Sequence, residues 1–416
     1  MDRRFLRARG ITRRELARAG LGGAAALCTL GGIPAHSVFG RIAHAVAPPR
    51  ASNQRILVVF EMSGGNDGLN TLVPYGDDAY YRHRPTIGLK PDGLLRLDDH
   101  FALNPGMVGF ERLWRAGDLA IVHGCGYDNP SFSHFTSMAY WQTAAPNSGA
   151  EYGWVGRLAD AMDPAGTPNF VVNVGATQSL AVRSAEHVPV VFDDPDTFQR
   201  AGFFQEQPVF EHVAPADGVD NPARRYLLEV ARSALDASAL VREAWASFRT
   251  PIDYGLVPLD LDKVAALIAA DLPARLYYAS FRNNAFDTHV HQNDLHQRLL
   301  TYAADAIAAF MADMERIGRA DDVVLLAFSE FGRRVPENTS LGTDHGTAGP
   351  MFVVGKPVAG GYYGALPSLT DLVEGDNLRH TTDFRRVYAT VAGGWLGYPD
   401  TDGLLGGEFP PLPMFA

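Results

Sequence analysis

Short apolar runs alternate with longer amphipathic stretches along the chain from about residue 54. The apolar runs are rich in Val, Leu, Ile and Phe and contain few polar positions. That pattern is typical of strands buried on both faces of a parallel sheet. The runs predict strands at residues 56–60, 119–124, 170–175, 322–328 and 350–355, with 275–281 as a further candidate.

The stretches between these runs show helical periodicity or helix-boundary signals. The clearest is 104–117, which begins with Asn-Pro and ends at Gly117. Residues 195–220 are rich in Asp, Pro, Phe and Gln without periodicity, and they predict a loop or a small cap. Helices are predicted at residues 104–117, 153–162, 222–248, 260–271, 293–317 and 383–397.

This alternation predicts the fold class, an α/β domain with a mainly parallel sheet and helices on both faces. No internal repeat, low-complexity tract or linker interrupts the sequence after residue 47, so we expect residues 48–416 to form a single domain. Ligands of such sheets bind beyond the carboxyl ends of the strands. The residues that follow each predicted strand are therefore the candidates for a functional site.

The first 47 residues predict an export signal. Arg13-Arg14 precedes a short Gly/Ala-rich apolar run, and the small residues Ala43, Ala45 and Ala47 supply a signal-peptidase site. The run is too short and too weakly apolar for a membrane span. The twin Arg is similar to a twin-arginine (Tat) signal, although a second pair lies at 3–4 and a basic N-terminal helix of a soluble protein is the alternative. We expect export by the Tat machinery to the periplasm or medium, without stable membrane insertion once the signal is removed.

Charge excludes two classes of partner. Residues 1–47 hold eight Arg and two acidic residues, so their removal changes the formal net charge from −11 to −17. A surface of this charge repels nucleic acid and anionic membranes, and an anionic substrate would need local cations in its pocket. Cys125 is the one Cys after residue 47, which excludes an internal disulfide there and leaves a buried structural Cys or a nucleophile.

Polar clusters follow the first two predicted strands. Asp67 lies in a Gly-rich run after 56–60 and is either a ligand or an ordinary turn residue. The run lacks the GxGxxG and P-loop patterns, so no nucleotide cofactor is expected. Ser131, Ser133 and His134 follow 119–124 at the start of a predicted helix. A hydroxyl group there is either a helix N-cap or a nucleophile assisted by free N–H groups.

The densest cluster of ligand-type residues follows the strand candidate 275–281. Asp287, His289, His291 and His296 fall within ten residues, and the Asp-x-His and Asp-x₃-His spacings suit a divalent cation. The alternative is that His291 and His296 belong to the next helix and face solvent.

The remaining candidates flank the last two predicted strands. Glu330 follows 322–328, and Asp344-His345 precede 350–355. Arg333 lies between them, where it would either clamp an anionic group bidentately or pair with a surface acid. Carboxylates, imidazoles and a hydroxyl at strand ends predict one site, that of a metal-assisted hydrolase in which a metal-bound Ser or water attacks an ester.

Several blocks of the sequence resemble one bacterial family. LVVFEMSGGNDGLNTLVPYGDDAYYRHRPTIGL, SFSHFTSMAYWQT, FDTHVHQ, SEFGRRVPEN and GTDHGTAGPMFVVG, in this order, resemble the family known as domain of unknown function 1501. That family is similar to the alkaline phosphatase and sulfatase superfamily. The resemblance implies a three-layer α/β/α sandwich, Tat export and hydrolysis of phosphate or sulfate esters with two divalent metals.

The resemblance also implies roles for individual residues. Asp67 would be a carboxylate ligand, and Ser133 or Ser131 the nucleophile. Asp287 would ligate together with His291, by the superfamily's spacing, or with His289, by the FDTH block. His345 would be the last His of that metal site.

The block Ser329-Glu330-Phe331-Gly332 resembles the superfamily's Ser-Asp-His-Gly with two departures. Glu330 can still ligate a metal, whereas Phe331 cannot. The missing ligand would then be Asp344 or His134, or a single metal would bind.

The sequence is consistent with two functions. The first is an exported hydrolase that uses one or two divalent ions (Zn, Mn or Ca) on a small-molecule or polysaccharide phosphate or sulfate ester. The alternative is a non-catalytic exported binding or accessory protein on the same scaffold.

Overall fold

The computed structural model describes residues 55–198 and 237–415. The predicted export signal at 1–47, nearly all of the predicted cap at 195–220 and the first part of the helix predicted at 222–248 lie outside the described residues. Residues 237–247, the described part of that last segment, are helical.

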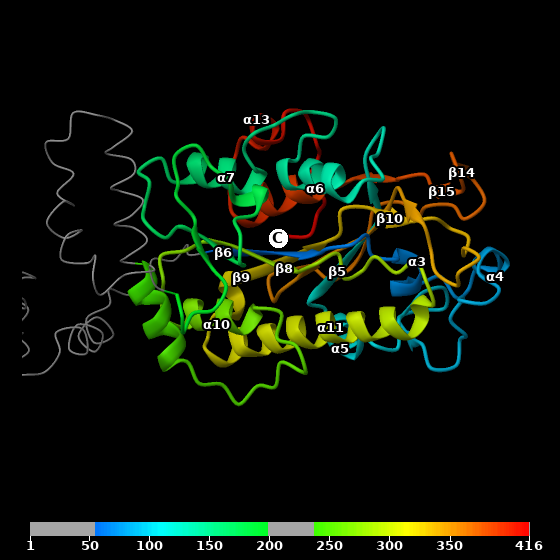
Figure 1. Cartoon of the computed structure of the whole chain (residues 1–416), viewed down its shortest axis with the longest axis horizontal. Coiled ribbons are helices and arrows are strands. Elements are labelled where there is room, and N and C mark those ends of the chain that lie inside the picture. Colours follow the sequence, from blue (N-terminus) through cyan, green and yellow to red (C-terminus); the bar gives the residue numbers. More distant parts are fainter. Residues whose placement is uncertain (1–54, 199–236, 416) are drawn as a thin grey trace, which may run out of the picture. The chain divides into compact units, whose positions relative to one another are not determined.

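A nine-stranded sheet forms the centre of the described structure (Figure 1). The strand order is β13-β5-β12-β9-β1-β8-β6-β7, and β16 also pairs with β5. Every strand predicted from an apolar run is present. The strands are β1 (Ile56–Met62), β5 (Leu119–Gly126), β6 (Val171–Val174), β7 (Val190–Phe192), β8 (Leu276–Phe281), β9 (Val323–Phe328), β12 (Gly349–Val354), β13 (Gly361–Tyr363) and β16 (Thr382–Asp383).

The sheet is mostly parallel, as predicted, and β12 runs against the rest. β1 pairs parallel with β8 and β9, and β12 pairs antiparallel with both β9 and β5. The chain from β9 to β12 carries no crossover helix that would return it to the opposite edge, so it stays at the carboxyl edge and β12 starts there. Residues 329–348, which hold several predicted site residues, therefore lie at that edge of the sheet.

Helices cover both faces of the sheet, which confirms the predicted three-layer α/β/α architecture (Figure 1). On one side lie α5, α10 and α11, and on the other α6, α7, α12 and α13. The helices are α3 (Gly68–Thr71), α4 (Asp78–His83), α5 (Val108–Ala116), α6 (His134–Thr143), α7 (Trp154–Met162), α10 (Leu261–Ala269), α11 (Gln292–Arg316), α12 (Phe384–Ala389) and α13 (Thr401–Leu405), with short turns at Leu180–Val182 and Ala320–Asp322 and a π-helical segment at Thr390–Trp395.

Alternation along each strand creates the two cores. Val58 and Phe60 of β1 join the core beneath α5, α10 and α11, whereas Leu57 and Val59 join the core beneath α6, α7 and α12. All four side chains are fully buried. Successive strand residues point to opposite faces, so a continuous apolar run is required where both faces are covered.

Smaller elements surround the carboxyl edge of the sheet. They form a three-stranded sheet and two hairpins, and the hairpin β10-β11 is the one that carries site residues. The strands are β2 (Leu72–Val73), β3 (Leu95–Arg96), β4 (Ala102–Leu103), β10 (Gly332–Arg333), β11 (His345–Gly346), β14 (Leu372–Val373) and β15 (Asn377–Leu378).

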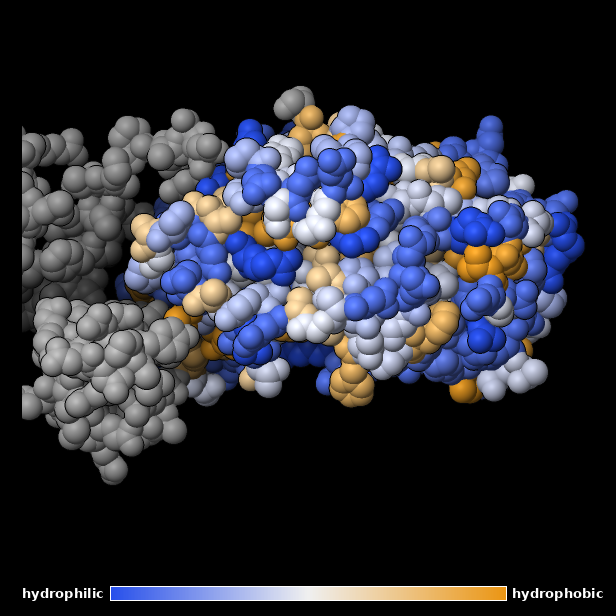
Figure 2. Space-filling model, turned by 90° about the horizontal axis from the view of Figure 1, so that it is seen from above, coloured by the Kyte–Doolittle hydropathy of each residue, from blue (hydrophilic) through white to orange (hydrophobic). Residues whose placement is uncertain are grey.

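The face above α6, α7 and α13 is mostly hydrophilic, with small separate apolar patches (Figure 2). No helix within residues 55–198 and 237–415 has the length and apolar character needed to cross a membrane.

Candidate metal centre

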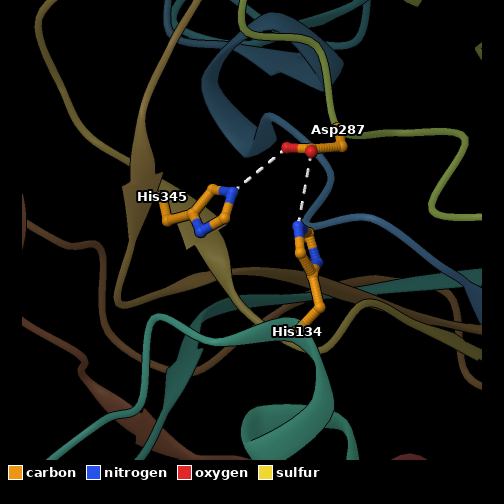
Figure 3. Close-up of side chains that lie close together, drawn as sticks. All are labelled: His134, Asp287 and His345. Atoms are coloured by element: carbon orange, nitrogen blue, oxygen red, sulfur yellow. Dashed lines mark hydrogen bonds and ion pairs between the residues drawn. The ribbon is translucent and has the colours of Figure 1, made fainter.

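Three chain segments bring ligand-type side chains together at the carboxyl edge of the sheet (Figure 3). His134 is the first residue of α6, Asp287 lies in the loop after β8, and His345 lies on β11. One ligand atom from each residue lies within 4.8 Å of the other two. Residues far apart in sequence thus form one cluster, as expected for segments that meet at the carboxyl edge of a mostly parallel sheet, even though β5 and β8 are not neighbours in it.

Asp287 is the centre of this cluster. His134 Nε2 lies 3.4 Å from Asp287 Oδ2, and His345 Nε2 lies 3.1 Å from Oδ1. His289 lies beside these three residues: its Nε2 is 2.9 Å from Asp287 Oδ1, 2.9 Å from His345 Nε2 and 3.4 Å from Arg333 Nη1. Three imidazole nitrogens therefore converge on one carboxylate.

The other nitrogen of each ring meets an oxygen acceptor. His134 Nδ1 lies 2.8 Å from Glu330 Oε1. His345 Nδ1 lies 2.7 Å from the carbonyl oxygen of Phe132, and His289 Nδ1 lies 3.4 Å from Asp344 Oδ1. An oxygen acceptor favours the tautomer with the proton on Nδ1, which leaves the Nε2 lone pair directed at the centre.

This arrangement fits a divalent cation. In a tetrahedral site with bonds of about 2.1 Å, neighbouring ligand atoms lie about 3.4 Å apart. His134 Nε2 lies 3.4 Å from Asp287 Oδ2, and the Nε2 atoms of His345 and His289 lie 3.1 and 2.9 Å from Oδ1. His134 Nε2 is buried and, among the described residues, makes no hydrogen bond, although it lies 3.4 Å from Asp287 Oδ2. An unsatisfied buried nitrogen is costly in an apolar setting, and a metal ion would satisfy it.

Arg333 fixes Asp287 and the backbone around the centre by hydrogen bonds. Its side chain is fully buried, and it donates to the carbonyl oxygens of Gly65 (2.6 Å), Gly64 (2.5 Å) and Thr343 (2.9 Å) and to Asp287 Oδ1 (2.7 Å). This geometry corrects the expectation of a catalytic anion clamp, because the guanidinium donors are already used. Burial alone would raise the pKa of Asp287, but the hydrogen bond and charge of Arg333, together with His345 and His289, outweigh burial and bring that pKa to about 2.

Glu330 contacts a ligand rather than the centre itself, unlike the ligand role expected for it. Its buried carboxylate accepts from Gly64 N (2.9 Å) and Ser329 Oγ (3.1 Å) besides meeting His134. The hydrogen bond to Glu330 raises the pKa of His134, with partial burial acting against it. Glu330 therefore orients the ring, as carboxylates commonly do for metal-binding histidines.

Phe331 fills the space beside the cluster. It is 2% exposed, and its ring centroid lies 5.0 Å from that of His134 and 4.6 Å from that of His345. The ring also covers Gly65, where φ is +72° and an added Cβ would lie 2.0 Å from the Phe331 ring. At the position where the superfamily pattern has a ligand His, this chain therefore has an aromatic side chain that packs against His134 and His345.

Asp67, expected to be a ligand, is engaged elsewhere. It is fully buried, and both of its oxygens accept from Arg84 Nη1, at 2.9 and 2.7 Å. Gln292 Nε2 donates to Oδ2 at 2.6 Å, and Leu69 N donates to Oδ1. Arg84 also binds the carbonyl oxygens of Arg334 and Val335. Asp67 is thus half of a buried ion pair that supports the chain beside β10.

The remaining candidates lie at the margin of the cluster. Ser133 is the exposed N-cap residue of α6, and its backbone N–H donates to Ser131 Oγ at 3.3 Å. His291 is exposed and precedes α11 in a left-handed conformation. Asp344 binds His289 rather than lying at the centre. Cys125 is buried and free, and burial raises the pKa of its thiol, which favours a structural role.

Two contributions were not predicted from the sequence. The carbonyl group of Phe132 orients His345, and Arg84 neutralises Asp67. Every residue has a backbone carbonyl group, so the identity of Phe132 gives no indication that its carbonyl group accepts a hydrogen bond from His345. The Asp67–Arg84 pair is 17 residues apart and not separated by a helical interval, so no spacing rule indicates it.

Comparisons with known proteins are distant. No curated protein matches the chain. A protein of the alkaline phosphatase superfamily from Vibrio parahaemolyticus is similar at 10% identity with a TM-score of 0.37, over 75% of this chain and 62% of that chain. The lipoteichoic acid synthase LtaP from Listeria monocytogenes is similar at 8% identity with a TM-score of 0.36, over 76% of this chain and 67% of that chain. The C-terminal periplasmic domain of EcEptC from Escherichia coli, in complex with Zn, is similar at 11% identity with a TM-score of 0.33, over 74% of this chain and 75% of that chain.

One family match covers the part of the chain that supplies most of the centre. Residues 273–403 include Asp287, His289, Glu330 and His345. They match the family described as "Protein of unknown function (DUF1501)", which confirms the resemblance predicted from the sequence.

Proposed function

We propose that this protein is a metal-dependent hydrolase of phosphate or sulfate esters that binds one divalent cation through His134, Asp287, His289 and His345. The observation that carries the proposal is the convergence of three Nε2 atoms on one carboxylate while each Nδ1 meets an oxygen acceptor. Structural histidines seldom need this arrangement, whereas metal ligands regularly have it.

The protein residues prepare the site before any ligand arrives. A divalent cation bound there would polarise an ester oxygen and lower the pKa of water. Glu330 keeps a proton on Nδ1 of His134, and Arg333 keeps Asp287 ionised and fixed in place. Phe331 excludes water from the side of the imidazole rings that it covers.

The geometry favours one ion rather than two. Phe331 occupies the position where the superfamily pattern has a His, and the Asp67 carboxylate is neutralised by Arg84. Three imidazoles and one carboxylate suit Zn²⁺ or Mn²⁺ better than Ca²⁺, which prefers oxygen ligands.

The nucleophile in this proposal is water or the hydroxyl group of Ser133 or Ser131. Ser133 lies beside His134 at the exposed start of α6, where the free N–H groups of the first turn favour a developing negative charge. The variants Ser133→Ala and Ser131→Ala separate them: a loss of about 10³-fold or more in kcat in one variant indicates that its hydroxyl group attacks, whereas small changes in both indicate water.

The test joins metal content to activity. Purified protein is assayed on aryl phosphate and aryl sulfate panels with and without Zn²⁺ or Mn²⁺, and its metal is measured by elemental analysis. We expect about one equivalent of metal, and loss of both metal and hydrolysis in Asp287→Ala. The matched control is Asp371→Ala, whose carboxylate is 70% exposed in a pair with Arg379. Unchanged metal content in Asp287→Ala would falsify the proposal.

A non-catalytic metal-binding protein is the second candidate. It is favoured by Phe331, which stands where a ligand of a second ion would be expected. One equivalent of metal, lost in Asp287→Ala, together with no hydrolysis of any ester would support this candidate over the hydrolase.

We also propose that residues 1–47 are a Tat signal and that residues 48–416 form the exported domain. The support is the pattern of Arg13-Arg14, the apolar run and the small residues before residue 48.

A further inference from the structure

A cavity of about 300 Å³ lies at the carboxyl edge of the sheet, where the end of β5 meets α3, β2 and residues 366–370. None of its lining residues is a proposed metal ligand. Cavities that bind small molecules start at about this volume and combine an apolar wall with a few polar groups. This wall is mostly apolar and includes Leu69, Leu72, Phe101, Pro350, Leu369 and Leu378.

His123 of β5 is the polar side chain of interest in this wall. It is 4% exposed, and its Nε2 is buried without a hydrogen bond to any described residue. Its ring packs against those of Phe101 and Tyr362, with centroids 5.0 and 5.1 Å away. Burial lowers the pKa of His123 to about 4, so the imidazole is neutral near pH 7. An unpaired buried nitrogen costs free energy, which a hydrogen bond from a bound molecule would recover.

The wall carries little charge. No Lys or Arg is among the described residues that line the cavity. Its one carboxylate, that of Asp77, caps α4 by accepting from the backbone N–H of Ala79 at 2.8 Å. A charged group that entered the cavity would lose its hydration without a free ionic partner in return. The wall therefore favours an uncharged ligand.

The size and lining of the cavity indicate what kind of uncharged ligand fits. An apolar cavity of about 150 Å³ holds one benzene ring, so twice that volume suits two fused rings. Aromatic ligands also gain from contact with aromatic side chains such as Phe101 and His123. A hydroxyl group can donate or accept, so it can pair with His123 in either tautomer. Leu366 belongs to the wall and is 51% exposed, so the wall reaches the surface, where a ligand can enter.

We infer that this cavity binds a small uncharged molecule with two fused aromatic rings and one hydroxyl group. The rings would fill the apolar part, which removes their surface from water. The hydroxyl group would pair with the unsatisfied ring nitrogen of His123. This site is separate from the candidate metal centre, and its occupancy does not depend on the proposed hydrolysis.

The experiment is a titration of metal-free protein, so that a phenol cannot bind through a metal ion at the centre. The probe is 2-naphthol, and the comparison is 2-naphthoate, which has the same rings and a negative charge. Isothermal titration calorimetry at pH 7 should give saturable one-to-one binding of 2-naphthol with a Kd below about 1 mM. Binding of 2-naphthoate should be weaker by at least about tenfold, because its charge has no partner in the wall.

Two variants locate the binding site. His123→Phe keeps an aromatic ring but removes the nitrogen, so the affinity for 2-naphthol should fall about tenfold. Leu366→Trp puts a larger side chain at the exposed part of the wall and should also weaken binding by at least about tenfold. Leu256→Trp is the matched control, because Leu256 is 79% exposed and lies outside the wall. It should leave the affinity unchanged.

Three results would each overturn the inference. They are no saturable binding of 2-naphthol up to its solubility limit, equal affinity for 2-naphthoate, and an unchanged affinity in either His123→Phe or Leu366→Trp. Urea unfolding of His123→Phe checks that the variant folds, and its midpoint should not fall, because a buried unpaired nitrogen is removed. If that variant does not fold, Leu366→Trp decides the result, since its substitution is at a half-exposed position.

Discussion

Proton positions on individual histidines decide whether the cluster can bind a metal. If Glu330 or the Phe132 carbonyl group were absent, the rings of His134 and His345 could rotate or change tautomer, and their Nε2 lone pairs would no longer meet at Asp287. The residues that hold the histidines are thus as informative as the histidines themselves.

A second buried carboxyl group nearby predicts a pH effect on stability. Burial raises the pKa of Glu61 from 4.5 to about 7, although Tyr278 and Gln142 donate hydrogen bonds to it. Between pH 4.5 and 7 the folded state keeps a proton that the unfolded state has lost, so stability should fall as the pH rises through this window. The loss should amount to about 3 kcal/mol. Urea unfolding of metal-free protein at pH 5, 6, 7 and 8 measures it.

Glu61→Gln should remove this dependence, because the amide cannot ionise. Relative to the wild type, the variant should gain stability as the pH rises from 5 to 8. The matched control is Glu151→Gln, whose side chain is 61% exposed, and it should follow the wild type. Parallel stability curves for Glu61→Gln and the wild type would show that Glu61 titrates normally.

Ligand types were predictable from sequence, but their contacts were not. Asp287, His289 and His345 could be placed together because the first two follow a predicted strand and His345 shortly precedes another. Arg333 was expected to face a ligand and instead binds main-chain carbonyl groups. Those acceptors belong to loops whose path depends on tertiary packing, which residue types alone do not specify.

Among the elements, the positions of the strands were the easiest feature to predict from the sequence, and the directions of the strands were the hardest. A run such as Val323–Phe328 is apolar throughout because both of its faces are covered, and this leaves a clear pattern. The antiparallel direction of β12 leaves no such pattern, because a buried strand has the same apolar sequence pattern whichever way it runs. That direction nevertheless places His345 at the same edge as Glu330.

The packing of α6 should control metal affinity, because α6 carries His134. Trp141 of α6 is 2% exposed and stacks on Phe384 and Phe328, with ring centroids 4.2 and 5.6 Å away. Trp141→Ala should cost about 3–5 kcal/mol of stability and also weaken metal binding, since the helix loses its fixed position. Chemical unfolding and a metal-competition titration measure the two effects.

Trp154→Ala on α7 tests whether metal affinity depends on the placement of α6 or on the overall stability of the protein. Trp154 is fully buried and stacks on Tyr388 at 4.3 Å, and α7 carries none of the proposed ligands. It should destabilise the protein to a similar extent while the folded protein keeps its metal affinity. Equal loss of affinity in both variants would mean that global stability, not the placement of α6, controls the site.

At the scale of the whole molecule, the net charge and the folded candidate centre are both consistent with the proposed export route. If residues 1–47 are removed as proposed, the formal net charge changes from −11 to −17, because eight arginines and two acidic residues lie in that segment. Such a surface favours solubility and disfavours association with anionic lipid or nucleic acid. The candidate metal centre combines residues from α6, the loop after β8 and β11, so it can form only in the folded domain. A route that carries folded proteins suits this arrangement.

The proposed route predicts which arginine pair the cell requires. Replacement of Arg13 and Arg14 by Lys keeps the charge but removes the twin-arginine pattern, so the precursor should stay uncleaved in the cytoplasm. The same replacement at Arg3 and Arg4 is the matched control and should leave export intact, because that pair does not adjoin the apolar run. Cell fractionation and immunoblotting for the size of the product distinguish the two. If both variants are exported and cleaved like the wild type, residues 1–47 do not act as a Tat signal. If the 3–4 variant alone is retained, the second pair is the one that the machinery reads.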